Sequence, residues 1–257
     1  MICVIIPMYN FGEMTTKCID KTLENAGVEV DIVVVDDGSD VPFKDNRVKV
    51  LRQENRGFTS AVNTGILYAW NDYEYIHLLN NDTEPYPNFI SELIFVLEEY
   101  DDIGIAGSTR EAILDGKRII FNFTQDILAG NTTYSYEDLT DEFYNCAWIS
   151  FCSVLIKTSV LQQVGLLDHR MINHCSDNDY CTRAGMMGYK AVFVPKSKVF
   201  HHCEATTKSL NIDSTHDQKM FMPKIRCDYM KNILDMYPLD SSTGLKGKIK
   251  FSLREGK

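Results

Sequence analysis

The chain has 257 residues, of which 44% are hydrophobic and 24% are charged, enough for one large α/β domain with its own core, or for one domain with a small appendage. Its formal net charge of −10 and its pI near 5.1 argue against a general nucleic-acid binder, because phosphate neutralisation needs clustered Lys and Arg and no such run is present. An anionic substrate must therefore be bound by local positive charge, such as that of helix N-termini, a metal ion or a few cationic side chains.

The N-terminal run Ile2–Ile6 is apolar and meets Pro7, and we expect it to form the first strand. It lacks the basic start and the length of a signal peptide, and it is far too short to span a bilayer. The eight cysteines are scattered without a Cys-x-x-Cys pair, which favours a reducing compartment. We therefore predict a cytoplasmic protein without a transmembrane segment.

Apolar runs alternate with segments of helical period along the first hundred residues. This rhythm is typical of an α/β fold with a mostly parallel central sheet flanked by helices. Expected strands are Ile2–Ile6, Val30–Val35, Val48–Leu51, Tyr75–Leu79 and Ile103–Ala106, and expected helices are Met14–Ala26, Thr59–Trp70 and Phe89–Leu97.

The second half of the chain is less regular. We expect residues 1–205 to form the main domain, with an insertion at about 108–145 over the sheet edge, and residues 206–257 to form a helical extension with a basic tail. The tail is expected to be a solvated terminus, with peripheral contact to a membrane surface as the alternative. The expected elements are Trp148–Ile156, a helix Thr158–Val164, a helix from the cluster His174–Asp179 to about Gly188, a strand Ala191–Val194 ended by Pro195, and a helix near Gln218–Met236.

Polar residues recur where the expected strands end. Asp36 and Asp37 follow the apolar run Ile32–Val35 and precede Gly38-Ser39-Asp40. Ligands of open α/β sheets bind at the carboxyl ends of the strands, and carboxylates there suit ribose hydroxyls, a base N–H or a metal ion. Taken alone, such a turn is as often structural. Similar patches are Pro7–Asn10, Glu54–Phe58, Asn80–Thr83 and Ser176–Asp179.

These patches, in this order, resemble the family 2 glycosyltransferases, which use nucleotide-diphospho-sugars and have the Rossmann-like GT-A fold; the rhamnosyltransferase-like branch is the most similar. The resemblance covers about residues 2–205. The matching motifs are Ile6-Pro7-x-Tyr9-Asn10, Val35-Asp36-Asp37-Gly38-Ser39, Glu54-Asn55-x-Gly57-Phe58, Leu79-Asn80-Asn81-Asp82-Thr83, Val164-Gly165-x-x-Asp168, Asp177-x-Asp179-Tyr180-Cys181-x-Arg183 and Val194-Pro195 followed by His201.

The resemblance implies a donor site and a metal site. Asp37 would bind the base of the donor nucleotide, and a carboxylate that accepts from an imide N–H favours uracil or thymine over cytosine. Asp82 keeps the last carboxylate of the family's Asp-x-Asp motif, and it would hold Mn²⁺ or Mg²⁺ together with His201, with His202 as the spare ligand. The other implied donor-binding residues are Pro7, Tyr9 and Asp36 for base and ribose, and Asn80 and Asn81. Arg56 would contact the phosphates, with a surface arginine that binds no ligand as the alternative.

The resemblance also implies a catalytic carboxylate. Asp177 would remove the proton of an acceptor hydroxyl in a single displacement with inversion. The alternative is a helix cap, since Ser176 and Asp179 approximate a capping box. Trp148, Asp179 and Tyr180 are candidates for acceptor binding, with core packing as the alternative for the aromatic pair. Phe151 stands where a small residue is usual in the family, so the acceptor side of the pocket is expected to be narrowed or reshaped.

The expected partners are a nucleotide-diphospho-sugar donor and a glycan, lipid-linked or protein-linked acceptor, with no nucleic acid. Two other functions stay open. A non-catalytic nucleotide- or glycan-binding protein is the first, because the metal motif has Asn80 in place of its first carboxylate. A sugar-nucleotide nucleotidyltransferase shares the general architecture, but it would carry a Gly-rich basic loop after the first strand, and residues 7–12 contain no cation.

Overall fold

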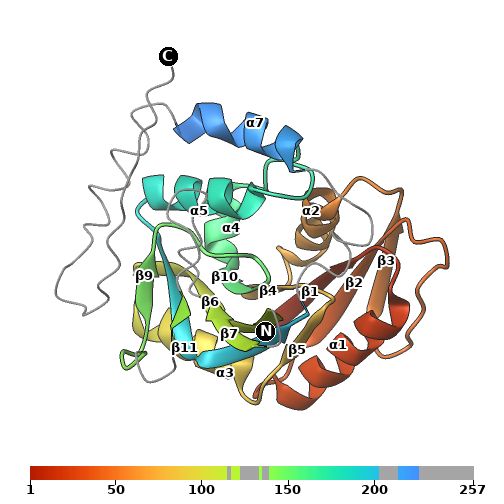
Figure 1. Ribbon diagram of the computed structural model, residues 1–257, viewed down its shortest axis with the longest axis horizontal. Coiled ribbons are helices and arrows are strands. Elements are labelled where there is room, and N and C mark those ends of the chain that lie inside the picture. The colour runs from red at the N-terminus through yellow and green to blue at the C-terminus, as the bar shows by residue number, and fades with distance from the viewer. Residues whose placement is uncertain (115–116, 122–132, 135–138, 203–213, 226–257) are drawn as a thin grey trace.

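The computed structural model describes residues 1–114, 117–121, 133–134, 139–202 and 214–225 (Figure 1). The elements are β1 (Ile2–Met8), α1 (Gly12–Asn25), β2 (Asp31–Asp37), β3 (Lys49–Gln53), α2 (Phe58–Ala69), β4 (Tyr75–Leu79), β5 (Thr83–Pro85), α3 (Phe89–Glu99), β6 (Ile103–Leu114), β7 (Lys117–Phe121), β8 (Thr133–Tyr134), β9 (Tyr144–Cys146), β10 (Ser153–Lys157), α4 (Thr158–Val164), α5 (Ser176–Met186), β11 (Lys190–His201) and α7 (Thr215–Ile225).

The strands form one sheet in the order β3-β2-β1-β4-β10-β6-β11-β5. The half made of β3, β2, β1 and β4 is parallel. In the other half β10 runs antiparallel to β4 and β6, whereas β6 and β11 are parallel to each other. Because β1, β2 and β4 run in the same direction, their carboxyl ends meet at one edge of the sheet.

Period-two alternation divides the core between the two faces of this sheet. In β1, Cys3 and Ile5 face α2, α4 and α5, whereas Val4 and Ile6 face α1 and α3. Figure 1 shows α1 and α3 on one side of the sheet and α2, α4 and α5 on the other. Both sets of side chains are fully buried, so the parallel strands read as continuous apolar runs.

Two strands run further than the sequence predicts. The prediction that Pro195 ends the last strand is wrong, because β11 continues to His201. Its pairing with β6 slips between Val194 and Lys198, and this irregularity accommodates the proline, which has no N–H for the ladder. The strand β6 likewise reaches Leu114, into the segment expected to be an insertion.

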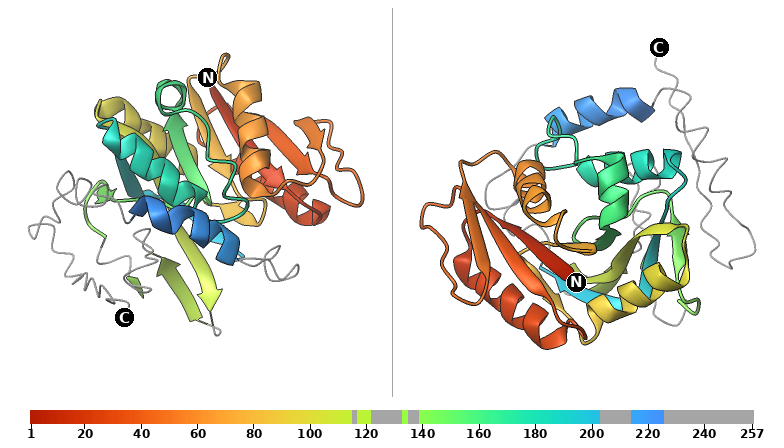
Figure 2. Two further views of the ribbon diagram at one scale, coloured as in Figure 1. Left: turned by 90° about the horizontal axis from the view of Figure 1, so that it is seen from above. Right: turned by 180° about the vertical axis from the view of Figure 1, so that it is seen from behind.

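Helix α7 starts at Thr215, three residues before the expected helix, and lies on the same side of the sheet as α2, α4 and α5 in each view (Figures 1 and 2). The part of the expected helix beyond Ile225 and the basic tail lie outside the described residues. No helix in the described part of the chain is long and apolar enough to cross a membrane.

Candidate active site

A cavity of about 1010 Å³ lies at the carboxyl ends of β1, β2 and β4, bounded by α2 and the start of α5. It brings together most of the residues that the sequence singles out, which come from seven separate segments of the chain. The residues lining it include Pro7, Tyr9, Asp37, Arg56, Asn80, Asn81, Asp82, Trp148, Asp177 and His201.

Asp37, the last residue of β2, lies in the wall of this cavity. Its carboxylate accepts hydrogen bonds from the backbone N–H groups of Arg56 and Gly57, at 3.0 and 2.8 Å, and from Gln53 Nε2 at 2.6 Å. Burial raises the pKa of Asp37, and these donors oppose the rise. The carboxylate is thus held in one orientation and keeps lone pairs for a donor on a ligand.

Asp36 differs from its neighbour in its surroundings, and its contact with the nucleotide stays a prediction. Its side chain is fully buried and accepts from Ser39 N–H (2.8 Å), Phe43 N–H (3.1 Å) and the Arg52 guanidinium. Burial works against ionisation, but these hydrogen bonds outweigh it and lower the pKa of Asp36. The residue therefore closes the loop after β2 and does not line the cavity.

We expect Asp36→Asn to lower the free energy of unfolding by about 2 kcal/mol at pH 7, because a buried ionised acceptor is lost. A lowered pKa in the folded state gives stability that is present above the ordinary pKa of 3.8 and is lost as the pH falls through the folded value. The deficit measured by urea denaturation should therefore shrink at acidic pH. Asp40→Asn, at an exposed carboxylate nearby, should leave stability within about 0.5 kcal/mol; an equal loss there would contradict the argument.

Asp82 and His201 meet because β5 pairs antiparallel with β11, which sets Thr83 opposite His201. Asp82 Oδ1 and His201 Nε2 lie 2.9 Å apart, and both side chains are nearly fully buried. Asn80 Nδ2 lies 3.5 Å from the same imidazole nitrogen, and Asn80 Oδ1 is buried with no hydrogen-bond partner among the described residues. His202 is exposed, pairs with Glu84 at 2.6 Å and does not line the cavity.

This group fits part of the ligand shell of a divalent ion. Two neighbouring ligands of an octahedral ion with bonds of about 2.1 Å are about 3 Å apart, which matches the Asp82 and His201 atoms. The orphaned oxygen of Asn80 is a third possible ligand. No group of three His, Cys, Asp or Glu side chains within the described ranges is arranged to hold a metal ion. An ion here would therefore need oxygens from a substrate or water, and the imidazole favours Mn²⁺ over Mg²⁺.

Asp177 lies in the first turn of α5, in the wall of the same cavity. Its Oδ1 accepts from the backbone N–H of Asn178 at 2.8 Å. Burial is the largest influence on the pKa of Asp177 and raises it, while backbone N–H groups, including that of Phe151, and the nearby His174 oppose the rise. The carboxylate is consequently more basic than one in water, as a general base requires.

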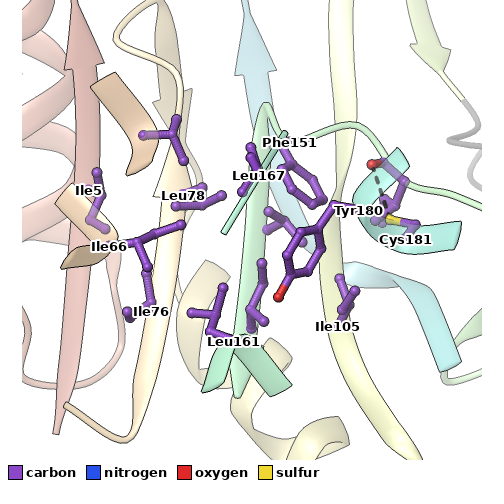
Figure 3. Close-up of a cluster of buried hydrophobic side chains, with 14 of the residues drawn as sticks. Ile5, Ile66, Ile76, Leu78, Ile105, Phe151, Leu161, Leu167, Tyr180 and Cys181 are labelled. Carbon is purple, nitrogen blue, oxygen red and sulfur yellow. Dashed lines mark hydrogen bonds between the residues drawn. The ribbon is translucent and has the colours of Figure 1, made fainter. Parts of the chain in front are cut away.

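Asp179 and Tyr180 do not line the cavity formed by the described residues, and their contact with an acceptor stays a prediction. Asp179 is buried and pairs with Arg183 at 2.9 Å. Tyr180 is fully buried, and its ring packs against Phe151 within the core cluster (Figure 3). The expected capping box is also absent here: α5 begins after Cys175, which makes no side-chain cap.

The loop of residues 172–175 lines the cavity and is held by a contact that the sequence analysis missed. The buried carboxylate of Asp217, on α7, accepts from the backbone N–H groups of Ile172, Asn173 and His174 at 2.7–2.8 Å. Phe221 of the same helix packs on Met171 and Cys175. No local sequence pattern predicts these hydrogen bonds, because Asp217 and the loop that it contacts are more than forty residues apart in the chain.

The family model described as Glycosyl transferase family 2 matches residues 3–165. The chain belongs to this family. The glycosyltransferase GlyG of Streptococcus pneumoniae is 28% identical over 209 residues, 76% of this chain and 68% of GlyG. An uncharacterized glycosyltransferase of Rickettsia typhi is 26% identical over 82% of this chain and 67% of its own length. The rhamnosyltransferase-like branch stays a prediction.

Solved structures confirm the GT-A fold of this family 2 glycosyltransferase. A mannosyltransferase of Pyrobaculum calidifontis, crystallised with GDP-Man and Mn²⁺, superposes with a TM-score of 0.61 at 18% identity, over 96% of this chain and 70% of its own. GalNAc-T7, crystallised with UDP, GalNAc and Mn²⁺, gives a TM-score of 0.64 at 17% identity, over 79% of this chain and 44% of its own.

Proposed function

We propose that this chain transfers a sugar from a nucleotide-diphospho-sugar to a hydroxyl of a glycan or glycoconjugate acceptor, with inversion at the anomeric carbon. UDP- and dTDP-sugars are the favoured donors, and GDP-sugars the alternative. The observation that carries the proposal is that one cavity holds Asp37, the pair Asp82 and His201, and Asp177. These are a base-recognising carboxylate, a metal-binding group and a basic carboxylate.

In the proposed reaction the acceptor oxygen attacks the anomeric carbon while its proton passes to Asp177, and the bond from that carbon to the diphosphate oxygen breaks. Asp82, His201 and Asn80 would hold the divalent ion, which when bound neutralises the diphosphate charge. Arg56, exposed at the cavity rim, would contact the phosphates. Pro7 and Tyr9 would complete the pocket for base and ribose, and Asn81 would contact the donor beside them.

The solved relatives support a nucleotide-sugar donor and a divalent ion, because both were crystallised with a nucleotide and Mn²⁺. Their nucleotides and sugars differ, so neither names the sugar here. The acceptor half of the cavity includes Trp148 and the fully buried Phe151, and we expect these side chains to limit the size of the acceptor.

A thermal-shift panel of UDP, GDP, dTDP and CMP, each with Mn²⁺ or with EDTA, tests the donor half of this proposal. A ligand at about 100 times its dissociation constant adds about 2.7 kcal/mol, which moves the melting temperature of a chain of this size by several degrees. We expect UDP or dTDP to give the largest shift, and only with Mn²⁺.

The outcome also separates the proposal from its alternatives. A nucleotide-dependent shift without any sugar transfer, in a screen of donors and acceptors, would favour a non-catalytic binding protein. Formation of a nucleotide-sugar from a nucleoside triphosphate and a sugar phosphate would favour a nucleotidyltransferase. The absence of any shift would contradict the assignment of Asp37 to base recognition.

A further inference from the structure

The side-chain amide of Asn178 lies between the proposed base and a tryptophan. With its nitrogen toward Asp177, Nδ2 donates to Asp177 Oδ1 at 2.8 Å, and Asn178 Oδ1 accepts from Trp148 Nε1–H at 3.0 Å. The reverse orientation would set two acceptors against each other on one side and two donors on the other. Because an indole N–H only donates and an ionised carboxylate only accepts, these two neighbours select one orientation of the amide.

We propose that Asn178 is a positioning residue for Asp177, and that Trp148 holds the Asn178 amide in the orientation that donates to the carboxylate. This inference rests on the proposed function of Asp177 as the general base. The three residues form a relay that runs from the indole N–H through the amide to the carboxylate, and we refer to Trp148, Asn178 and Asp177 as the relay.

The relay is built into the core. Trp148 and Asn178 are 8% and 7% exposed. The indole belongs to the core cluster that α2, α4 and α5 share with the sheet, so it cannot swing away without opening that cluster. Asn178 gives Asp177 Oδ1 a second donor through its backbone N–H, at 2.8 Å. Two donors on one oxygen fix the rotation of the carboxylate and leave proton transfer to its remaining lone pairs.

The relay also opposes the effect of burial on Asp177. A hydrogen bond to the charged form of a carboxyl favours that form, so the Asn178 amide keeps the base ionised at a lower pH than burial alone would allow. Other groups act on the same carboxyl and must be separated from the relay in an experiment. His174 and Cys175 on the preceding loop and Cys181 on α5 interact electrostatically with this carboxyl. The charged and titratable groups that line the same cavity are Asp37, Arg56, Asp82, Arg110 and His201.

The first test follows the indole N–H groups by two-dimensional ¹⁵N–¹H NMR during a pH titration of the metal-free protein. The chain has two tryptophans, Trp70 and Trp148, so Trp70→Phe assigns the two signals and serves as the matched control. We expect the Trp148 signal to move as Asp177 titrates, and Asp177→Asn to abolish the movement. Asn178→Leu, which removes the amide, should abolish it too.

His174→Gln separates the relay from the nearby histidine. It should change the midpoint of the titration and leave the movement in place. A Trp148 signal that does not titrate in the wild type, or that titrates equally in Asn178→Leu, overturns the inference. This NMR readout needs no substrate, so it tests the relay separately from the role of Asp177 as the base. If the Trp148 signal does not titrate, the relay is refuted and Asp177 can still be the base. If the relay is intact but the Asp177→Asn enzyme is active, only the proposed function is refuted.

The second test is kinetic. Asn178→Leu should shift the acid limb of the pH profile of kcat/KM to higher pH by about one unit. The ratio of wild-type to variant kcat/KM should therefore be about tenfold larger at low pH than on the plateau. Trp148→Phe keeps a ring in the core and should move the limb in the same direction by less, with the KM for the donor unchanged. In the Asn178→Leu background, Trp148→Phe should add no further shift. Independent, additive shifts of the two variants would overturn the relay.

Discussion

Asp177→Asn is expected to lower kcat by about 10³-fold and to leave nucleotide binding nearly unchanged. The amide has almost the shape of the carboxylate, but it cannot accept the proton of the acceptor hydroxyl. The measurement is release of the nucleoside diphosphate from the donor in the presence of an acceptor found by screening, together with the thermal shift that the same nucleotide produces with Mn²⁺.

The stability of this variant gives a second expectation. Burial raises the pKa of Asp177, so its ionised form is less favourable in the folded protein than in the unfolded chain at neutral pH. Removing the charge should therefore leave the melting temperature equal or higher. Asp179→Asn is the matched control, because it breaks the buried pair with Arg183 and should lower stability. A folded Asp177→Asn protein that loses transfer and nucleotide binding to the same extent would make Asp177 a structural residue.

The raised pKa also fixes the direction of the pH dependence. The base acts only when ionised, so kcat/KM should fall as the pH decreases through the pKa of Asp177. Because that pKa is raised, the fall should begin above the ordinary carboxyl value of 3.8. Activity that stays constant down to that value would contradict a buried base.

The positions of the site residues follow from the strand pattern. Parallel strands bring their carboxyl ends to one edge, so Pro7, Asp37 and Asn80 can be placed together from their position after apolar runs alone. The alternation of side chains between the two faces of β2 also predicts that Asp36 and Asp37 lie on opposite faces of the sheet. Asp36 shares the face of Ile32 and Val34, which pack under α1, whereas Asp37 shares the face that the cavity occupies.

Other features depend on contacts that no local pattern encodes. The sequence places Tyr180 and Asp177 in the same helix turn, but only the packing against Phe151 shows that the tyrosine belongs to the core. Asn178 stands at the unspecified position of the motif Asp177-x-Asp179, and its proposed role depends on Trp148, thirty residues earlier. The predicted end of β11 at Pro195 failed because a slip in register can absorb a proline inside a strand.

The domain boundary near residue 205 remains a prediction. Helix α7 lies beyond it, yet Asp217 holds three amides of the loop that precedes Asp177. We expect the C-terminal segment to support the acceptor side of the cavity rather than to form a separate unit. The contact between Phe221 and Met171 adds an apolar anchor to the same loop.

Asp82→Ala is expected to remove the metal-dependent part of nucleotide binding. If the carboxylate and His201 share one ion, losing either ligand should weaken binding of the diphosphate in the presence of Mn²⁺ by about 100-fold, or about 2.7 kcal/mol. The thermal shift of the variant with Mn²⁺ should then equal that of the wild type with EDTA. His201→Ala should behave in the same way.

His202→Ala is the matched control for this experiment. His202 is the neighbouring imidazole, but it is exposed and pairs with Glu84 outside the cavity, so its loss should leave the Mn²⁺-dependent shift in place. Loss of the shift in His202→Ala with its retention in His201→Ala would reverse the assignment of the imidazole ligand. A wild-type shift that is equal with Mn²⁺ and with EDTA would remove the ion from donor binding and leave Arg56 and the backbone around the cavity to hold the diphosphate.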